Sequence, residues 1–457
     1  MQSGHLTVVG AGPKAVAIAA KRKVLADLGV PVPQVVVLDG QGTGANWTGE
    51  FGYTDGSLPL GTPPEKDVGF PYSSAGYTPR LALEVNTALL QFSWAAFHVL
   101  DTNHSYAEWV DRGKPNPKHE HWAEYLEWAA DQAEMKLIES DLAHMEITGS
   151  HWKVDLESGD QLETDGVVIT SPGPPRRQLE IPEPSEWIFD GKNFWLDDTI
   201  KQIAARVEER QQLNACVIGS GETAAAIVVS LDRLLGPEGS IAVISKEGII
   251  YTRGESYEEN RLYSSPEAWR NFPEATRRQF VKRTDRGVFS VSNKAVLNRS
   301  ESVRTLSGSV RSIKKTEGAL CLDFHDREPL AGYDLVVDAT GFEREWFFPR
   351  MGPRAQKTLL DQLKISSGGD AAGCPAEEFG AELSRALDQC VGLDLSVGGL
   401  KPHLHLPMHA ALEQGPGFPN LSCLGLLSDR ILQCHCPSDL LDLPENLQNT
   451  EAEPKII

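Results

Sequence analysis

The chain begins with a short apolar run, a longer helix-like segment and a second apolar run. Residues 6–9 (Leu-Thr-Val-Val) are almost uniformly apolar and bounded by glycine, which predicts a buried parallel strand. A segment rich in alanine, lysine and leucine over 15–28 predicts a helix that ends at Gly29. Residues 35–38 (Val-Val-Val-Leu) predict the next strand, which runs into Asp39. Together these segments predict a strand–helix–strand unit.

The same order returns in the middle of the chain. Residues 215–218 (Ala-Cys-Val-Ile) predict a strand, and the turn 219–224 (Gly-Ser-Gly-Glu-Thr-Ala) opens an alanine-rich helix. Residues 241–244 (Ile-Ala-Val-Ile) predict the strand that follows. Two such units favour an α/β fold with two Rossmann-like dinucleotide-binding domains.

Further apolar patterns predict elements between and after these units. Apolar residues at i, i+3, i+4 and i+7 predict amphipathic helices over 122–129 and 200–207. Residues 166–173 and 335–342 each indicate a core strand that runs into a turn of small residues.

Composition and charge narrow the class of protein. The 457 residues include 43 Lys and Arg against 64 Asp and Glu, a net charge of −21. Nucleic acid and anionic membranes both need a basic surface, so we expect neither as a partner. Seven scattered cysteines oppose a disulfide-stapled secreted scaffold. The sequence has no apolar stretch of about 18 residues and no signal-peptide pattern, which predicts a soluble cytoplasmic protein.

The first glycine turn has the residues that a pyrophosphate site requires. Glycines remove side chains where backbone must approach phosphates, and a small residue one turn later lets the helix pack on the strand. The residues that we expect to hold a nucleotide here are Gly10, Gly12, Pro13, Lys14 and Ala15. Asp39 closes the second strand, where a ribose hydroxyl needs an acceptor; it follows Gly10 by 29 residues rather than the usual ~20. The alternative is a tight structural turn.

The second turn has the same glycine pattern but a different end to its second strand. Its candidate residues are Gly219, Gly221, Glu222 and Thr223. The strand that follows ends in Ser245 and Lys246, and a hydroxyl with an ammonium accepts a 2′-phosphate that a carboxylate would repel. Arg253 is another candidate for that phosphate. The pattern favours NADP over NAD, while a solvated surface role for Lys246 stays open.

Two dinucleotide units in one chain suggest electron transfer between the nucleotides, and the most economical pairing is FAD in the first and NADPH in the second. We expect the FAD-binding domain to span 1–207 and, after an NADPH-binding domain at 208–330, to resume over 331–457 with a small helical substrate region. Within this last part, 366–373 predicts a mobile loop and 437–457 a frayed tail.

Segments spread along the whole chain match one known family. They are 44–47 (Gly-Ala-Asn-Trp), 54–56 (Thr-Asp-Gly), 60–72 (from Leu-Gly-Thr-Pro-Pro to Phe-Pro-Tyr), 107–113 (Ala-Glu-Trp-Val-Asp-Arg-Gly), 219–224, 283–290 (Arg-Thr-Asp-Arg-Gly-Val-Phe-Ser) and 414–422 (Gln-Gly-Pro-Gly-Phe-Pro-Asn-Leu-Ser). In these segments the chain closely resembles the lysine N6-monooxygenases of mycobactin and nocobactin siderophore biosynthesis. More distantly it is similar to the ornithine N-hydroxylases, class B flavin monooxygenases that carry FAD and NADPH.

The resemblance implies roles for individual residues. Lys66 matches the family lysine that holds the substrate α-carboxylate, and Asn260 matches an asparagine that holds the same amino-acid head. Ser422 matches the serine of a C-terminal segment near flavin and substrate. Trp47 matches a tryptophan beside the isoalloxazine pocket.

The match to the ornithine enzymes has departures. Their Thr-His-Gly turn is replaced by residues 414–417, the glutamine five residues before the carboxylate lysine is Gly61, and their Asn-Tyr-Ser segment reads Val-Phe-Ser at 288–290. The last change removes an amide that would hold substrate or cofactor, so ornithine geometry should not be assumed. The family's alanine-threonine-glycine turn is kept, which makes Thr340 and Gly341 candidate cofactor residues.

The implied reaction is N-hydroxylation of the side-chain amine of L-lysine with NADPH and O2, through a flavin hydroperoxide, in siderophore biosynthesis. The amine must react as a neutral nucleophile, and since its free pKa is about 10.4, neutrality near pH 7.5 costs about 4 kcal/mol. Burial would lower this cost, while Lys66 would place the amine by fixing the distant carboxylate. The sequence shows no general base, so we predict no catalytic side chain. We expect a homo-oligomer.

Other functions stay open from the sequence. L-ornithine or another diamine is the nearest alternative substrate, and an NADPH oxidase-like flavoprotein would share both nucleotide sites. A flavin disulfide reductase needs a closely spaced cysteine pair near the flavin, and Cys434 and Cys436 come too late in the chain for this. A noncatalytic dinucleotide-binding sensor would be excluded by reduction of bound flavin with NADPH.

We predict no metal site. Residues 434–436 (Cys-His-Cys) lack a second ligand pair at metal-site spacing. His403, His405 and His409 are close in sequence, and the first two share a strand face, but no carboxylate motif accompanies them. Cys423 lies in an apolar run and is predicted to be a buried thiol.

Overall fold

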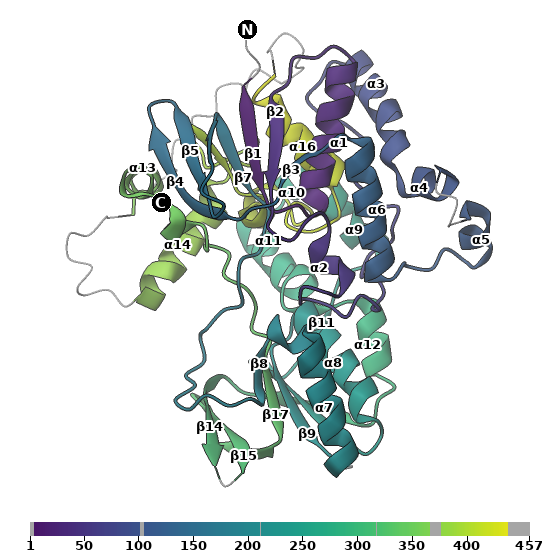
Figure 1. Ribbon diagram of the computed structural model, residues 1–457, viewed down its shortest axis with the longest axis vertical. Coiled ribbons are helices and arrows are strands. Elements are labelled where there is room, and N and C mark those ends of the chain that lie inside the picture. The colour runs from purple at the N-terminus through teal and green to yellow at the C-terminus, as the bar shows by residue number, and fades with distance from the viewer. Residues whose placement is uncertain (1–3, 101–104, 211, 317, 366–375, 437–457) are drawn as a thin grey trace.

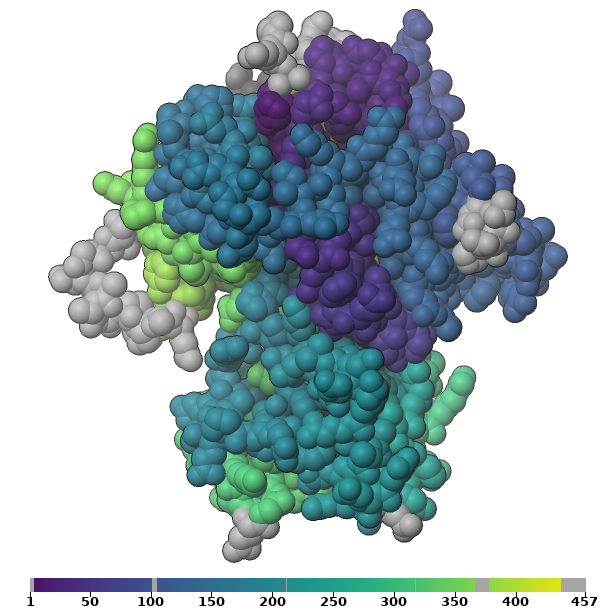
Figure 2. All heavy atoms as spheres, in the orientation of Figure 1, coloured from purple at the N-terminus to yellow at the C-terminus, as the bar shows by residue number. Residues whose placement is uncertain are grey.

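The computed structural model describes residues 4–100, 105–210, 212–316, 318–365 and 376–436, and shows two lobes built on separate sheets (Figure 1). In Figure 2 the upper lobe is the wider and the lower lobe is formed mainly by the middle of the chain. The predicted loop at 366–373 and the predicted tail at 437–457 lie outside the described residues.

The upper lobe contains a five-stranded parallel sheet. Its strands, in spatial order, are β18 (His403–His405), β7 (Gly166–Ile169), β1 (His5–Val9), β2 (Gln34–Leu38) and β3 (Lys136–Ile138). All four residues of β7 are buried, as are the last four of β1 and of β2, which explains their uniform apolar sequences.

The lower lobe contains a second five-stranded parallel sheet. Its strands, in spatial order, are β13 (Val303–Ser307), β10 (Ser240–Ser245), β9 (Asn214–Ile218), β17 (Leu335–Asp338) and β8 (Ile188–Asp190). Buried valine, isoleucine and alanine side chains from its central strands and from the helix that follows β9 form a core separate from that of the upper lobe.

Each parallel sheet is covered by a three-stranded antiparallel sheet, and a short parallel pair lies near the junction of the lobes. The strands are β4 (Leu142–Thr148), β5 (His151–Leu156) and β6 (Gln161–Thr164) in the upper lobe, β14 (Val310–Thr316), β15 (Ala319–Phe324) and β16 (Leu330–Tyr333) in the lower lobe, and the pair β11 (Tyr251–Thr252) and β12 (Val288–Phe289).

Helices complete both lobes. In the upper lobe they are α1 (Pro13–Asp27), α2 (Ala45–Thr48), α3 (Pro79–Leu89), α4 (Trp94–Leu100), α5 (Tyr106–Asp111), α6 (His119–Gln132), α13 (Pro353–Leu363), α14 (Ala376–Cys390), α15 (Ala411–Gln414) and α16 (Leu424–Gln433). The others are α7 (Asp197–Arg210), α8 (Glu222–Leu235), α9 (Tyr257–Ser264), α10 (Pro266–Arg270), α11 (Glu274–Phe280) and α12 (Val291–Leu297), with a π-helical turn at Val281–Asp285 and 3-10 turns at Leu90–Phe92, Asn193–Trp195, Phe348–Arg350 and Pro407–His409. Among the described residues, no helix is both long and apolar enough to cross a membrane.

The predicted elements are confirmed with small shifts of their ends. The helix expected at 15–28 is α1, and the amphipathic patterns at 122–129 and 200–207 lie within α6 and α7. Helix α1 starts two residues earlier than predicted because Pro13 occupies its first turn, where a missing N–H costs nothing.

The predicted domain limits of 1–207, 208–330 and 331–457 are wrong at two strands. Strands β8 and β17 were assigned to the flanking domain, but β17 pairs with β9 and β8 pairs with β17, so both belong to the lower sheet. The lower lobe therefore starts before residue 188 and continues past residue 335. A run of buried residues predicts a strand, but not which of two parallel sheets it joins.

A second helical region, outside 331–457, lies between the two lobes. Helices α9, α10 and α11 lie between β11 and β12 in sequence, and α10 and α11 pack against α15 of the upper lobe. Trp269 of α10 donates from its indole N–H to the Leu412 carbonyl at 2.9 Å. This helical region therefore joins the two lobes.

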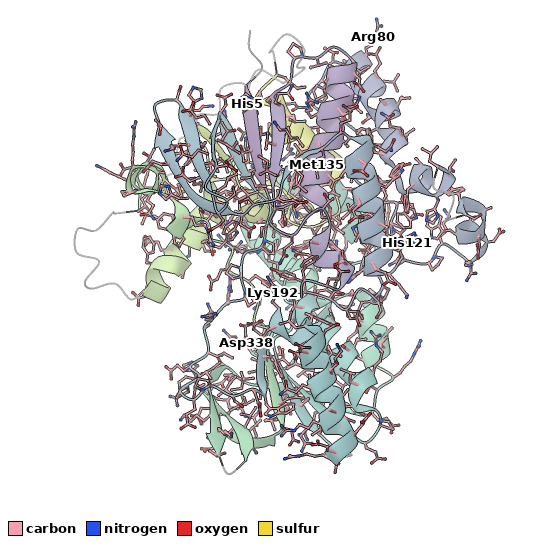
Figure 3. All side chains as sticks on the ribbon, in the orientation of Figure 1. His5, Arg80, His121, Met135, Lys192 and Asp338 are labelled. Atoms are coloured by element: carbon pink, nitrogen blue, oxygen red, sulfur yellow. The ribbon has the colours of Figure 1, made fainter. Side chains whose placement is uncertain are left out.

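Lys192 marks the junction of the lobes, whereas Asp338 lies within the lower lobe at the end of β17 (Figure 3). The Lys192 ammonium lies 5.2 Å from the centre of the Tyr53 ring, a cation–π contact across the junction.

Candidate active site

The first glycine turn faces open space at the start of α1. Gly10 has φ +99°, and a Cβ there would lie 2.7 Å from the Thr170 hydroxyl oxygen, so this position needs glycine. A Cβ on Gly12 would meet nothing within 4 Å. Ala15, one turn into α1, is fully buried. The backbone at the start of this helix is thus accessible to a ligand, as a pyrophosphate site requires.

Asp39 lies at the end of β2 and contacts the same turn. Its carboxylate accepts hydrogen bonds from the Ala11 N–H at 2.8 Å and the Gln41 N–H at 2.9 Å. Asp39 follows Gly10 by 29 residues in the sequence, yet the end of β2 lies directly against the first glycine turn. The carboxylate still lines the cavity described next, where a ribose hydroxyl can reach it.

One cavity of about 480 Å³ joins the two lobes at this point, which is within the size range of ligand sites. Residues of both glycine turns line it, together with residues from the C-terminal part of the chain. The lining includes Gly10–Lys14, Asp39, Gly44–Trp47, Tyr53, Thr54, Gly61, Thr62, His119, Thr170–Pro172, Glu222, Thr223, Arg253, Asp285, Gly287, Ser290, Asn293, Met408 and Pro419–Ser422.

Trp47 lies on the wall of this cavity. Its ring packs edge-on against His119, with centroids 4.8 Å apart. The His119 Nδ1 lies 2.8 Å from the Thr54 hydroxyl, and burial lowers the pKa of His119 to about 4, so this imidazole is neutral at pH 7. The wall near Trp47 therefore combines aromatic and uncharged polar groups.

The three predicted substrate residues lie close together beside this cavity. Lys66 donates from Nζ to the Asn260 side-chain oxygen at 2.8 Å, and Asn260 donates to the Glu255 carbonyl at 2.9 Å. Arg253 donates to the buried Ser422 hydroxyl at 3.0 Å. Neither Lys66 nor Asn260 lines the cavity itself, whereas Arg253 and Ser422 do.

The electrostatics tie these residues into one cationic group. Burial lowers the pKa of Lys66 to about 8, and the charge of Arg253 contributes to the shift. The Arg253 guanidinium in turn lies 4.3 Å from the centre of the Tyr263 ring and 3.9 Å from the Asp285 carboxylate. Each cation has a carboxylate nearby, Asp285 beside Arg253 and Glu255 close to Lys66, so a further anion would bind in competition with these groups.

Lys14 is a buried lysine that lines the cavity. Its Nζ donates to the Pro419 carbonyl at 2.8 Å, and burial lowers its pKa to about 8. Cys423, predicted to be a buried thiol, lies near this ammonium; burial raises its pKa to about 12. The thiol is therefore protonated at neutral pH.

The second glycine turn borders the same cavity from the lower lobe. Gly219 has φ +139°, and a Cβ there would lie 2.3 Å from the Ala339 carbonyl oxygen. Gly221 caps α8, and a Cβ there would meet only Gly287, at 4.0 Å. The Glu222 carboxylate accepts from the Ser290 N–H at 2.6 Å and the Asn293 amide at 2.7 Å.

Seven predicted cofactor residues lie outside the cavity lining: Ala15, Gly219 and Gly221, described above, and Ser245, Lys246, Thr340 and Gly341. The Thr340 hydroxyl donates to Asp338 at 2.6 Å, and Gly341 has φ +118°, next to the second glycine turn. The Ser245 hydroxyl donates to the Ile249 carbonyl at 3.4 Å, and Lys246 is exposed. Both pairs follow the carboxyl ends of lower-sheet strands, the edge at which Rossmann folds bind nucleotides.

Arg253 was grouped with Ser245 and Lys246 as a phosphate ligand from sequence spacing alone. In the structure its guanidinium contacts Ser422 and Asp285. Arg253 therefore lies with the residues predicted to bind the amino-acid substrate. Its spacing along the chain did not suggest this grouping.

Some lining residues were missed by the sequence interpretation. Residues 170–172 (Thr-Ser-Pro) follow β7, and the Thr170 hydroxyl donates to the Val9 carbonyl at 2.8 Å. The rule that parallel strands present ligands at their carboxyl ends could have identified them, because the strand and its turn were recognised. Asp285, which accepts from the Asn420 amide at 3.0 Å, has no local signal since its partner is 135 residues away.

The upper part of the cavity fits a dinucleotide such as FAD. The open space at Gly12, the acceptor Asp39 and the aromatic wall at Trp47 supply positions for a pyrophosphate, a ribose and a flat ring. The second turn offers the same helix start, again without a side chain at its cap residue Gly221. Both predicted sites therefore have donor sets of the right chemistry.

Comparison with protein families gives a match to residues 91–344, described as L-lysine 6-monooxygenase/L-ornithine 5-monooxygenase. The L-lysine N6-monooxygenase MbtG of Mycobacterium sp. (strain MCS) is 40% identical over 433 residues, which cover 93% of this chain and 94% of that protein. MbtG of Mycobacterium tuberculosis (strain ATCC 25618 / H37Rv) is 38% identical over 436 residues, with coverage of 93% and 94%.

Two solved structures have the same fold over nearly the whole chain. Lysine monooxygenase NbtG from Nocardia farcinica, described for an unprecedented NADPH domain conformation, matches with a TM-score of 0.76 and 36% identity, covering 94% of this chain and 100% of that one. The ornithine N-hydroxylase KtzI of Kutzneria sp. 744, solved with reduced FAD, NADP+ and L-ornithine, matches with a TM-score of 0.68 and 15% identity, covering 95% and 99%. The second match supports the fold alone.

Proposed function

This chain belongs to the L-lysine 6-monooxygenase/L-ornithine 5-monooxygenase family, and from that premise we propose that it hydroxylates the side-chain amine of L-lysine for siderophore biosynthesis. The balanced reaction consumes lysine, O2, NADPH and a proton, and yields N6-hydroxylysine, NADP+ and water. Bound FAD, reduced by NADPH, supplies the activation of O2 that such an oxygen transfer needs.

The proposal rests on one observation: a glycine turn suited to a nucleotide and a group of cationic side chains lie at the same cavity. Gly12 opens the cavity to a dinucleotide, while Arg253 and Ser422 line it and Lys66 lies alongside. A substrate carboxylate held by Lys66 and Asn260 would leave its side chain free to extend toward the ring site. The relatives named as lysine monooxygenases, at 36–40% identity, favour lysine as that substrate.

The residues of this site divide into three tasks. Those proposed to hold FAD are Gly10, Gly12, Pro13, Lys14, Ala15, Asp39 and Trp47, and those proposed to hold NADPH are Gly219, Gly221, Glu222, Thr223, Ser245, Lys246, Thr340 and Gly341. Those proposed to hold the amino acid are Lys66, Asn260 and Ser422. Arg253, which contacts Ser422, is added to this group.

The cavity also lowers the cost of a neutral amine. Burial lowers the pKa of two of the chain's own lysines at this place, Lys14 and Lys66, to about 8. A substrate amine in the same surroundings is shifted in the same direction, and Arg253 repels its ammonium form. A shift of that size would remove most of the roughly 4 kcal/mol needed for neutrality, without a general base.

The direct test supplies purified enzyme, FAD and NADPH with lysine, ornithine, putrescine or N6-acetyllysine in parallel. Hydroxylamine product, NADPH consumption and hydrogen peroxide are measured together. We expect lysine to give the highest ratio of hydroxylated amine to NADPH consumed. A higher ratio with ornithine or putrescine would transfer the assignment to that amine, and consumption of NADPH without any hydroxylated amine would indicate an oxidase.

Cytoplasmic location and homo-oligomeric assembly are part of the proposal. Exposed apolar side chains on α3 and α4, among them Leu83 and Val99 at 68% exposure each, are the surface that we propose for contact between copies. Light scattering of the purified enzyme tests the assembly, and cell fractionation tests the location. A monomer at micromolar concentration would contradict the proposed homo-oligomer.

A further inference from the structure

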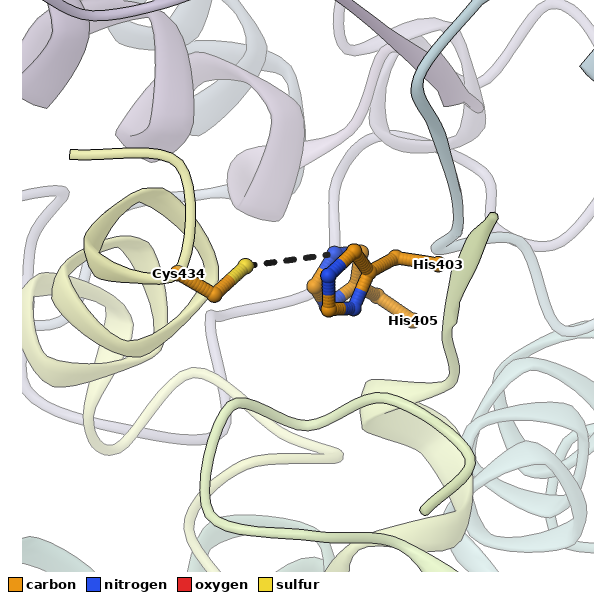
Figure 4. A group of neighbouring side chains, drawn as sticks. All are labelled: His403, His405 and Cys434. Atoms are coloured by element: carbon orange, nitrogen blue, oxygen red, sulfur yellow. Dashed lines mark hydrogen bonds between the residues drawn. The ribbon is translucent and has the colours of Figure 1, made fainter. Parts of the chain in front are cut away.

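The fold brings together three side chains that the sequence did not suggest as a site. His403 and His405 lie on the edge strand β18, and Cys434 caps the C-terminal end of α16 (Figure 4). One ligand atom from each lies within 4.8 Å of the other two. From the sequence we predicted no metal here, because residues 434–436 lack a second ligand pair and no carboxylate motif accompanies the histidines. The fold brings the two groups together, although Cys434 lies 29 residues downstream of His405.

The separations are close to those of a zinc site. Zinc bonds of about 2.0–2.1 Å to nitrogen and 2.3 Å to sulfur, at tetrahedral angles, place ligand atoms about 3.3–3.6 Å apart. The Cys434 Sγ already lies 4.0 Å from the His405 Nε2, the contact drawn in Figure 4. Side-chain adjustments of at most about 1.5 Å would therefore close the three ligands on an ion.

The hydrogen bonds fix the imidazole of His405 in the form that binds metals. His405 is fully buried, and its Nδ1 lies 2.8 Å from the Asp394 backbone carbonyl. A carbonyl only accepts, so Nδ1 carries the hydrogen and Nε2 presents its lone pair toward Cys434.

His403 is held in a similar way by charged neighbours. Its Nδ1 lies 3.4 Å from the Asp394 carboxylate, and its Nε2 lies 2.5 Å from the Lys401 ammonium. Since an ammonium only donates, Nε2 carries the lone pair. Lys401 is exposed and can turn into solvent when an ion takes its place.

His435, the neighbour of Cys434, lies near the three ligands, but its ring nitrogens are not among the atoms that lie within 4.8 Å of one another. The ring of His435 lies 5.4 Å from that of His403 and 5.7 Å from that of His405. Its Nε2 is buried and has no hydrogen-bond partner within the part of the chain that the structure describes. The ring packs on Gly166, where a Cβ would lie 3.4 Å from its Cε1.

We propose that His403, His405 and Cys434 bind one Zn²⁺ that ties β18 to the C-terminal end of α16, with water as the fourth ligand. Imidazole and thiolate donors favour zinc over magnesium or calcium, which prefer oxygen. On binding, the Cys434 thiol loses its proton to solvent and forms the Zn–S bond, with no change of oxidation state. Zn²⁺ with one thiolate retains a charge of +1, which the Asp394 carboxylate balances.

The site is separate from the proposed reaction cavity and does not depend on the proposed function. Helix α16 has ten residues between Cys423 and Cys434, so the metal lies about 15 Å from the end of the helix beside Ser422. The ion would act by fixing the far end of the helix that follows Ser422.

The test uses the untagged, FAD-loaded enzyme, stripped with EDTA and titrated with ZnCl2 against a chromophoric chelator. Metal content is measured by mass spectrometry, and X-ray absorption reports the ligands. We expect one Zn²⁺ per chain, with one sulfur at about 2.3 Å and nitrogens at about 2.0–2.1 Å. Cys434→Ser should weaken zinc binding more than about 100-fold, and Asp394→Asn about 10- to 100-fold.

Cys436→Ser is the matched control, because this thiol lies two residues away and contacts the Leu432 carbonyl at 3.3 Å. It should retain zinc. If Cys434→Ser purifies without flavin or with a changed circular dichroism spectrum, His403→Asn, at the edge of the sheet, provides a second test of the ligand set. Equal zinc content in wild type and Cys434→Ser, or equal loss in Cys436→Ser, would overturn the proposal.

Discussion

At the scale of single residues, the state of Lys66 decides how well the site can hold a carboxylate. In the proposed function its ammonium is the charged anchor of the substrate carboxylate, but burial lowers the pKa of Lys66 to about 8, close to working pH. The anchor is therefore complete below pH 8 and is lost as the pH rises through that value. The substrate amine needs the opposite condition, since it reacts only when neutral.

We predict that kcat/KM for lysine falls above pH about 8 because Lys66 loses its proton in the free enzyme. Lys66→Arg, which keeps its charge throughout this range, should not show the fall. Lys66→Met should lower kcat/KM for lysine about 10- to 150-fold, which corresponds to a charged hydrogen bond of about 1.5–3 kcal/mol. Hydroxylamine formation from pH 6.5 to 9.5 measures both effects.

Cadaverine is the control substrate, because it has the amine of lysine but no carboxylate. Lys66→Met should leave its kcat/KM nearly unchanged. Equal losses with lysine and cadaverine would mean that Lys66 does not act on the carboxylate. A fall above pH 8 that persists in Lys66→Arg would assign the titration to another group.

A substitution at Gly12 provides a second test at the residue scale, because it should weaken flavin binding without damaging the fold. Its φ of −82° suits any residue, and a Cβ would meet nothing within 4 Å. We predict that Gly12→Val folds as stably as the flavin-free wild type but purifies with less than about a tenth of the FAD, since the side chain enters the space proposed for the pyrophosphate. Absorbance of bound flavin and thermal melting of both apoproteins measure this. Full flavin content would rule out a close pyrophosphate contact at Gly12.

At the scale of elements, a buried ion pair joins the helix of the first glycine turn to the helix that follows Ser422. Lys21 of α1 and Asp429 of α16 lie 2.5 Å apart, both 1% exposed. Ser74 also donates to the Asp429 carboxylate, at 3.3 Å. The pair fixes the register of two helices whose N-terminal ends both reach the cavity.

Removal of one partner should be costly, because the other is left charged and buried. We predict that Lys21→Met lowers the free energy of unfolding by about 3–5 kcal/mol, and that adding Asp429→Leu restores much of it. Lys23→Met is the matched control on the same helix; its ion pair with Asp27 is exposed and should change stability by less than about 1 kcal/mol. Urea unfolding monitored by circular dichroism gives the values. A Lys21→Met effect no larger than the control would contradict a structural role for the pair.

The elements themselves were largely predictable from sequence, because their signals are local. Glycine turns, apolar runs and 3.6-residue periodicity identified β1, α1, β2, β9 and β10. Sheet membership was not predictable for β8 and β17, since pairing between distant strands leaves no local pattern. The same holds for the site: Lys66 and Asn260 are 194 residues apart and were grouped only through a family resemblance. The position of Arg253 and the cluster around Cys434 required the fold.

At the scale of the whole molecule, two lobes with separate cores share one cavity. Each glycine turn belongs to its own lobe, so two nucleotides can bind independently and still meet at the junction. Glu222 illustrates this, since it belongs to the second turn and lines the cavity through its contacts with Ser290 and Asn293.

This arrangement predicts separable protection of the two turns from hydrogen exchange. FAD added to flavin-free enzyme should slow exchange at residues 10–15 and 170–172, and NADP+ should slow exchange at 219–223. At a free ligand concentration of 100 times Kd, amides that exchange only from the unliganded state should slow about 100-fold, equivalent to about 2.7 kcal/mol. Exchange followed by mass spectrometry, with each nucleotide alone, distinguishes the possibilities. Protection of 219–223 by FAD alone would mean that the two nucleotides are assigned to the wrong lobes, and absence of protection at both turns would reduce them to tight structural turns.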